Sequence, residues 1–264
     1  MSKVTIKDIA KYCNVSTATV SYVINNKETQ SISEDTKSKI LHAVNMLNYK
    51  PSVIAKNLRT LPQHRLVAIY TDESAKYLNR LEYLHILDKA SSYFSEHNMS
   101  LVYGRKPYVQ INNADALLAY NLSKEEFREL GKNNFIPLIA LDSLINDHLF
   151  FQVTTNYQKI KEEANKVFSQ YTFIGLKPSS DELKEKIYSS FSNVELVSKV
   201  EDLYDISSNN IVTDSKVIYD YFSSKEGKVV LFNNGTLDRK IQQIYECIEQ
   251  ALSHNKFDIH FYEI

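Results

Sequence analysis

The stretch that decides the fold of the N-terminal part is residues 4–25, which read VTIKDIAKYCNVSTATVSYVIN. Thr5 is a favoured N-cap residue, and Ile6 and Ile9 follow it at helical spacing. Asn14 then stands where the periodic run stops, and asparagine accepts the left-handed conformation better than most residues. The pattern therefore predicts one short helix that ends in a tight turn.

A second helix is predicted directly after this turn. Ser16 is its expected N-cap, the helix covers 17–25, and Val20, Val23 and Ile24 form its apolar face. Two short helices across a tight turn are typical of a helix-turn-helix, whose second helix enters the major groove of DNA. A generic three-helix bundle is the alternative that the pattern leaves open.

Two more helical segments are expected further along the chain. Ser33 precedes a predicted third helix over 34–48, in which Ile40 and Val44 complete a small apolar core. Pro51 ends that segment, and a fourth short stretch is predicted over 53–59.

The charge of the chain is distributed unevenly. Residues 1–61 hold nine Lys or Arg and four acidic residues, a net charge of +5, while the remaining residues carry −6. A basic head on an acidic body favours a polyanion as the partner of the head.

These residues resemble the headpiece of LacI/GalR-type transcription regulators. The resemblance covers about the first sixty residues in the right order, including the string LNYKP at 47–51 and AKNLRT at 55–60, which resembles the hinge helix of that family. It implies a sequence-specific repressor that binds a near-palindromic DNA operator as a homodimer.

The resemblance also assigns roles to single residues. Four match family positions that contact DNA phosphates: Thr5, Ser16, Ser21 and Asn25. Three match positions that face base edges: Thr17, Ala18 and Tyr22. Tyr22 departs from the family, which usually has arginine there, so the operator is expected to differ at that base pair or to be read less stringently.

The hinge has two residues of interest. Leu58 matches a leucine that wedges between base steps in the minor groove, and Ala55, one turn earlier, is small enough to let the backbone approach. Packing of Leu58 on the body is the alternative reading.

From His64 onward, strand and helix patterns alternate, which predicts parallel sheets covered by helices. The order resembles the periplasmic-binding-protein-like body of the same family. We therefore expect an α/β protein with an all-α helix-turn-helix headpiece (residues 1–51), a hinge helix and linker (52–63) and a truncated body (64–264). The two subdomains of that body are expected at approximately 64–153 and 154–264.

The body resemblance also suggests a site for a small effector between the subdomains, lined by Asp72, Lys184 and Asn234. Lys184 falls near the arginine that anchors sugars in the family. The chain stops at Ile264, so we expect it to lack both a later acidic effector ligand and the segment that crosses back to the first subdomain. Two effectors stay open: a sugar-like small molecule, or a protein partner such as another regulator subunit.

Composition argues against several other functions. The five glycines are too far apart for a phosphate-binding or dinucleotide-binding loop, and no serine lies between two glycines. Two cysteines and seven histidines form no metal-binding pattern. No apolar run of membrane-spanning length and no signal peptide are present. We expect a soluble cytoplasmic protein without a cofactor, and not an enzyme.

Overall fold

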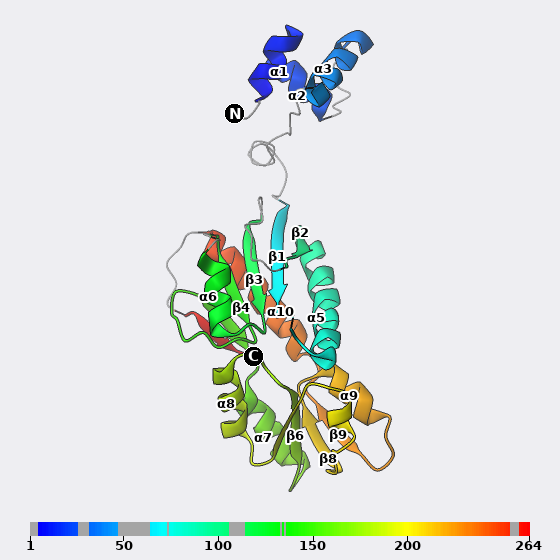
Figure 1. Ribbon diagram of the computed structural model, residues 1–264, viewed down its shortest axis with the longest axis vertical. Helices are drawn as coiled ribbons and strands as arrows, with labels where there is room; N and C mark the ends of the chain where they lie inside the picture. The colour runs from blue at the N-terminus through cyan, green and yellow to red at the C-terminus, as the bar shows by residue number, and fades with distance from the viewer. Residues whose placement is uncertain are drawn as a thin grey trace. The chain divides into compact units, whose positions relative to one another are not determined.

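The computed structural model describes residues 5–25, 32–46, 64–72, 74–105, 114–132, 134, 136–253 and 259–264. The chain divides into two compact units, residues 1–63 and 64–264. Each unit is described by itself below (Figure 1).

The first unit contains α1 (Ile6–Cys13), α2 (Thr17–Ile24) and α3 (Glu34–Met46). The three helices enclose one small core whose buried members are Ile9, Ala10, Cys13, Val20, Ile40 and Ala43. The helix expected at 53–59, and with it Ala55 and Leu58, lies outside the described residues.

The second unit, the body, begins with a six-stranded sheet of order β10-β5-β4-β3-β1-β2. Its strands are β1 (Arg65–Thr71), β2 (Met99–Tyr103), β3 (Ala116–Tyr120), β4 (Leu138–Leu141), β5 (Phe151–Thr154) and β10 (Phe261–Glu263). Helices α5 (Tyr77–Glu96) and α10 (Thr236–Leu252) share one apolar cluster with this sheet, and α6 (Lys124–Lys132) shares another. We call this sheet and its three helices the first subdomain.

A second sheet of order β7-β6-β8-β9 forms the other half of the body. Its strands are β6 (Thr172–Leu176), β7 (Val194–Val197), β8 (Asn210–Thr213) and β9 (Val229–Phe232). Helices α7 (Tyr157–Val167) and α8 (Asp181–Ser190) pack in one cluster, and α9 (Lys216–Ser223) in another with the short 3-10 helix η1 (Glu201–Leu203). Figure 1 shows the two sheets end to end, and we call this half the second subdomain.

All pairings between the described strands are parallel. The expected fold class is thereby confirmed: a helix-turn-helix unit followed by two parallel sheets flanked by helices. Among the described helices, none combines the length and the apolar character needed to cross a bilayer.

The expected second subdomain, 154–264, is wrong in its last part. Helix α10 buries Ile241, Ile244 and Ile248 in the cluster of the first sheet, and β10 pairs with β5. The segment that crosses back, which was expected to be missing, is therefore present. The apolar face of α10 suits either sheet by its spacing alone, so only the tertiary fold shows which sheet it covers. Strand β8 was also absent from the expected elements.

Candidate functional site

The turn between α1 and α2 has the geometry that the sequence predicts. Thr5 donates from its backbone N–H and from Oγ1 to the Asp8 carboxylate, at 2.8 and 2.7 Å. The pKa of Asp8 is lowered by these hydrogen bonds. Asn14 ends α1 in the left-handed conformation with φ 56°, which lets the chain reverse into α2 within three residues.

Helix α2 has an apolar and a polar face. Val20 is buried, and Val23 and Ile24 pack against the same core. The opposite face holds the predicted base-reading residues, of which Thr17 and Ala18 are exposed and Tyr22 is half-buried. These three side chains and Ser21 follow one another at helical spacing, so one surface can enter a groove while the other holds the fold.

Of the predicted phosphate contacts, Thr5 caps α1, and the other three lie toward the two ends of α2. Ser16 caps the helix by accepting the Thr19 N–H at 3.0 Å. At the other end, Asn25 Nδ2 donates to the Ser21 carbonyl at 2.7 Å and to Ser21 Oγ at 3.2 Å. The ends of the exposed face therefore carry oriented polar groups, as phosphate contacts require.

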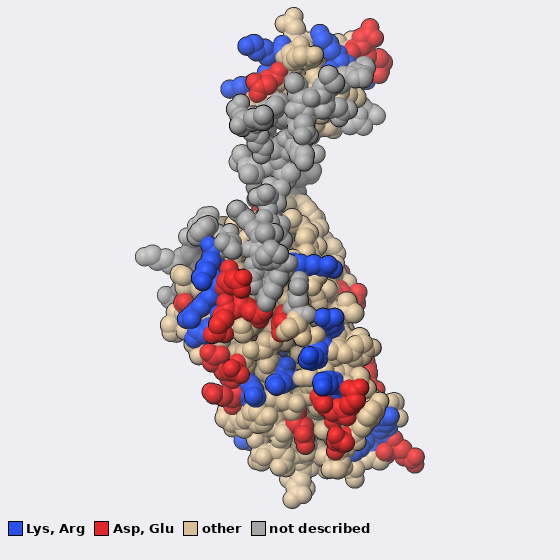
Figure 2. Space-filling model, viewed as in Figure 1, with Lys and Arg blue, Asp and Glu red and all other residues tan. Residues whose placement is uncertain are grey.

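Exposed basic side chains lie on the two other helices of the headpiece. Lys7, Lys11 and Lys39 are exposed, whereas Lys37 is paired with Glu34 at 2.6 Å. Figure 2 shows Lys and Arg side chains on the surface of the described part of the headpiece.

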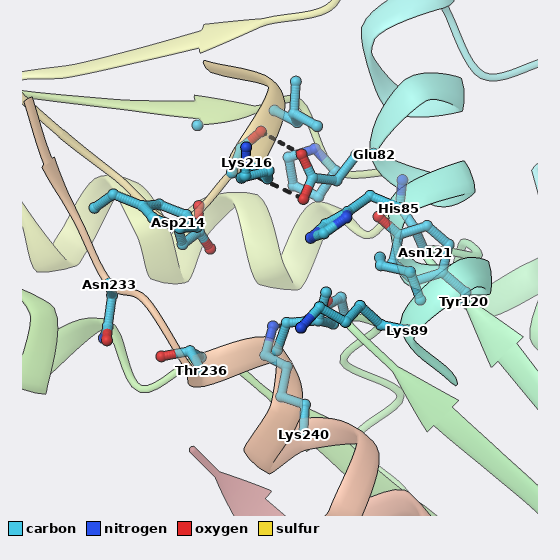
Figure 3. Close-up of a pocket in the computed structure, with 18 of the residues that line it drawn as sticks. Glu82, His85, Lys89, Tyr120, Asn121, Asp214, Lys216, Asn233, Thr236 and Lys240 are labelled. Carbon is cyan, nitrogen blue, oxygen red and sulfur yellow. Dashed lines mark hydrogen bonds and ion pairs between the residues drawn. The ribbon is translucent and has the colours of Figure 1, made fainter. Parts of the chain in front are cut away.

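A second candidate site is a cavity of about 210 Å³ between the two subdomains of the body. In Figure 3, Glu82, His85 and Lys89 from α5 face Asn233, Thr236 and Lys240 from the segment that leads from β9 into α10. Tyr120 and Asn121 at the end of β3, and Asp214 before α9, complete the lining. The cavity thus lies at the carboxyl ends of parallel strands, where ligands bind in folds of this class.

The charges inside this cavity are partly paired. Lys240, whose side chain is 7% exposed, forms an ion pair with Asp142 at 2.7 Å, and Lys89 pairs with Asp238 at 3.0 Å. Asp214 accepts a hydrogen bond from Thr155 Oγ1 at 3.2 Å. Burial raises the pKa of Asp214 to about 6, and the nearby carboxylates add to this effect while Lys240 opposes it.

The three predicted effector residues have different positions. Asn234 lines the cavity. Asp72 instead accepts hydrogen bonds from Ser74 in its own turn and from Ser179 Oγ at 3.2 Å in the other subdomain. Lys184 lies on α8 and is not among the residues that line the cavity, although its neighbour Leu183 is.

The sequence interpretation missed the charged residues that dominate the cavity, above all Glu82, Asp142, Asp214 and Lys240. Glu82 and Lys240 are 8% and 6% exposed, although both are in helices with ordinary amphipathic patterns. A signal for Asp142 and Asp214 was available, because each directly follows an apolar strand, at the edge where ligand sites form in parallel sheets.

Comparison with known proteins agrees with this geometry. The model of the lacI family of bacterial regulatory proteins matches residues 5–52. The PurR repressor of Haemophilus influenzae is 26% identical over 242 residues, an alignment that covers 81% of this chain and 70% of that protein. The PurR repressor of Photorhabdus laumondii is 42% identical over 73 residues, 28% of this chain and 21% of that protein.

Solved structures share the fold at low sequence identity. The lac repressor dimer bound to operator and the anti-inducer ONPF is 12% identical with a TM-score of 0.51, covering 100% of this chain and 96% of that one. A transcription-regulator-like protein from Staphylococcus haemolyticus is 10% identical with a TM-score of 0.51, covering 75% and 94%.

A helix-turn-helix unit followed by a two-sheet body is an architecture that DNA-binding transcription regulators such as the lac repressor have, and this chain shares that fold. Within that class, the match over residues 5–52 relates the headpiece to one family. The headpiece of this chain is similar to the lacI family of bacterial regulatory proteins.

Proposed function

We propose that this regulator represses transcription by binding a near-palindromic operator as a homodimer, with α2 of each headpiece in the major groove. The observation that carries the proposal is the divided surface of α2. Its buried side holds the headpiece together, while its exposed side presents Thr17, Ala18 and Tyr22 between polar ends. Because a dimer places two such helices on one duplex, a two-fold related pair of half-sites is expected.

Each residue of this face has a definite chemistry toward DNA. Thr17 offers a hydroxyl and a methyl group, and Ala18 offers apolar contact to a thymine methyl. Tyr22 offers one hydroxyl and a ring, in place of the two parallel donors that an arginine presents to guanine. Thr5, Ser16, Ser21 and Asn25 set the position of the helix through phosphates.

The proposal extends to the hinge. Leu58 from each subunit wedges between base steps in the minor groove, and Ala55 allows the close approach. A helix of this length is unstable alone, since isolated helices need about 12–15 residues. Its formation on DNA therefore depends on a second subunit, which the body recruits.

The cavity of the body is the proposed site of effector control. Its lining of lysines, carboxylates and asparagines suits a small polar molecule, with Asn234 as a contact. Asp72 is expected to act through its hydrogen bond with Ser179 of the other subdomain. Lys184 is expected to act from its position on α8. A protein partner is the other candidate effector. A protein of this function works in the cytoplasm, where its operator is.

The hinge gives a direct test of this function. Leu58→Ala removes the wedge without removing charge, so affinity for random DNA should stay within twofold while operator affinity and DNA bending fall by at least tenfold. Fluorescence anisotropy and gel mobility of the full chain on both DNAs measure this. Leu41→Ala is the matched control, because Leu41 is an exposed leucine of α3 in the same unit. Equal operator affinity of the wild type and Leu58→Ala would contradict the hinge mechanism.

A further inference from the structure

The N-terminal half of α5 belongs to both subdomains. Its later residues Tyr83, Ile86 and Phe94 are buried against the first sheet. Leu78 instead is 2% exposed in the apolar cluster of the second sheet, and its N–H donates to the Ser198 carbonyl at 3.4 Å. Asn79 Nδ2 donates to the Lys177 carbonyl at 3.0 Å. One rigid helix therefore connects the two halves of the body.

Glu82 makes several of the contacts between α5 and the second subdomain with a single carboxylate. Its Oε2 accepts hydrogen bonds from Ser215 Oγ at 2.5 Å and from the Val217 N–H at 3.1 Å, and its Oε1 accepts the Lys216 N–H at 3.3 Å. The donors are the N-cap and the first two residues of α9. Figure 3 shows the carboxylate of Glu82 directed at this helix start.

This arrangement favours a charged carboxylate. The first N–H groups of a helix have no partner within the helix, and the helix dipole places partial positive charge there. Hydrogen bonds to an ionised acceptor are about twice as strong as those between neutral groups. Ser215 Oγ serves twice, because it also accepts the Ile218 N–H at 3.3 Å as the cap of α9.

Other contacts at the subdomain junction hold fewer donors. The Ser179 N–H donates to Asn121 Oδ1 at 2.9 Å, Ser179 Oγ donates to the Asp72 carboxylate at 3.2 Å, and Lys186 of α8 forms an ion pair with Glu263 of β10. The Asn121 contact involves a neutral acceptor, and the Lys186 pair involves side chains that are 26% and 35% exposed. Exposed pairs contribute little because water and salt screen them. Glu82 is 8% exposed and holds three donors at once.

We propose that Glu82 is an intrachain latch that fixes the angle between the two subdomains and so sets the width of the cavity. The three hydrogen bonds exist only while α5 and α9 stay together, so widening the cavity breaks them as a set. A molecule that widens the cavity on binding has to break the hydrogen bonds of Glu82. A molecule that fits the cavity at its present width leaves them intact. Glu82, which itself lines the cavity, thus sets the width of that cavity.

The test measures the distance between the subdomains in the full chain by double electron–electron resonance. Ser91→Cys on α5 and Glu195→Cys on β7 place spin labels at exposed positions, while the native Cys13 and Cys247 are buried. Glu82→Gln replaces the carboxylate by a neutral group of the same size. Glu96→Gln, at an exposed position of the same helix, is the matched control.

A single narrow distance distribution is expected for the spin-labelled chain with Glu82 intact, and the same is expected for its Glu96→Gln variant. Glu82→Gln should widen the distribution at least twofold or add a second distance. A distribution for Glu82→Gln that is as narrow as that of the control would overturn the latch. Should Glu82→Gln fail to fold by circular dichroism, Glu82→Asp gives the same decision, because it keeps the charge but retracts the carboxylate from its donors.

Ser215→Ala supplies an independent check. It removes the shortest hydrogen bond of the latch, and combined with Glu82→Gln it should widen the distribution no further than either single change does. Additive widening would show that the two residues act separately and would refute the latch. The measurement uses no DNA, so its outcome is separate from that of the proposed repressor function.

Discussion

At the scale of single residues, we propose Tyr22 as the residue on which base reading by this headpiece depends most. It lies on the exposed face of α2 beside Ser21, while the neighbouring Val20 and Val23 keep the helix in place. Under this proposal, the reading of DNA at this position depends on one hydroxyl and one ring.

Tyr22→Arg should shift the preferred base toward guanine at one base pair of each half-site. The guanidinium adds two parallel donors, which discriminate by about 1–3 kcal/mol when both engage O6 and N7. In vitro selection with both proteins measures the shift. Tyr12→Arg, at an exposed position of α1, adds the same charge and should leave the selected sequence unchanged. Identical selected sequences for Tyr22→Arg and the wild type would mean that Tyr22 does not face a base.

Asp214 makes the stability of the body depend on pH. Its pKa is about 6 in the folded chain against 3.8 as the ordinary value, so the folded state binds the proton more tightly than the unfolded state. The contribution of this group to stability is full below pH 3.8 and is lost as the pH rises through about 6.

Asp214→Asn should therefore stabilise the body at pH 7.5, by on the order of 1 kcal/mol, because the neutral amide avoids the cost of burying a charged carboxylate. At pH 4 the difference between variant and wild type should shrink. Urea unfolding at both pH values measures this, with the exposed Asp220→Asn as control. A variant that is less stable than the wild type at pH 7.5 would contradict the assignment.

At the scale of elements, local patterns predicted most helices and strands well. The sequence predicts strands over 172–176 and 194–197 and a helix over 216–223, and β6, β7 and α9 have these bounds, because apolar runs with clear caps or polar flanks define them. Strand β8, over 210–213, was not predicted because its run NIVT has only four residues and begins with a polar one. Within the site, Ser16 as a cap and Asn14 as a left-handed residue were predictable, since both depend on neighbouring residues alone.

Leu78 shows what local patterns cannot predict. Its spacing on α5 is that of any core residue of that helix, yet its contacts are with the second sheet. Leu78→Ala should lower the free energy of unfolding by about 2–5 kcal/mol, since a fully buried leucine leaves a cavity when truncated. Leu149→Ala, at a position 76% exposed, should change it by less than about 0.5 kcal/mol. Urea unfolding at one fixed protein concentration compares the two, and similar small losses would contradict the connecting role of α5.

At the scale of the whole molecule, the sequence established the two units and their fold class but not the path of the chain through the body. Helix α10 and strand β10 return to the first sheet, and the cavity charges from Asp142, Asp214 and Lys240 meet only because of that return. Contacts between residues about a hundred positions apart, such as that of Lys240 with Asp142, leave no mark in a local pattern.

The central claim is that the headpiece of this chain binds a specific operator, and one measurement tests it most directly. In vitro selection of random duplexes by the full chain should enrich a near-palindromic sequence. Affinity for that sequence should then fall steeply with salt, by a log–log slope of about −0.9 for each phosphate neutralised by the basic headpieces. Selection without a palindrome, or an affinity that stays flat from low to physiological salt, would contradict the account.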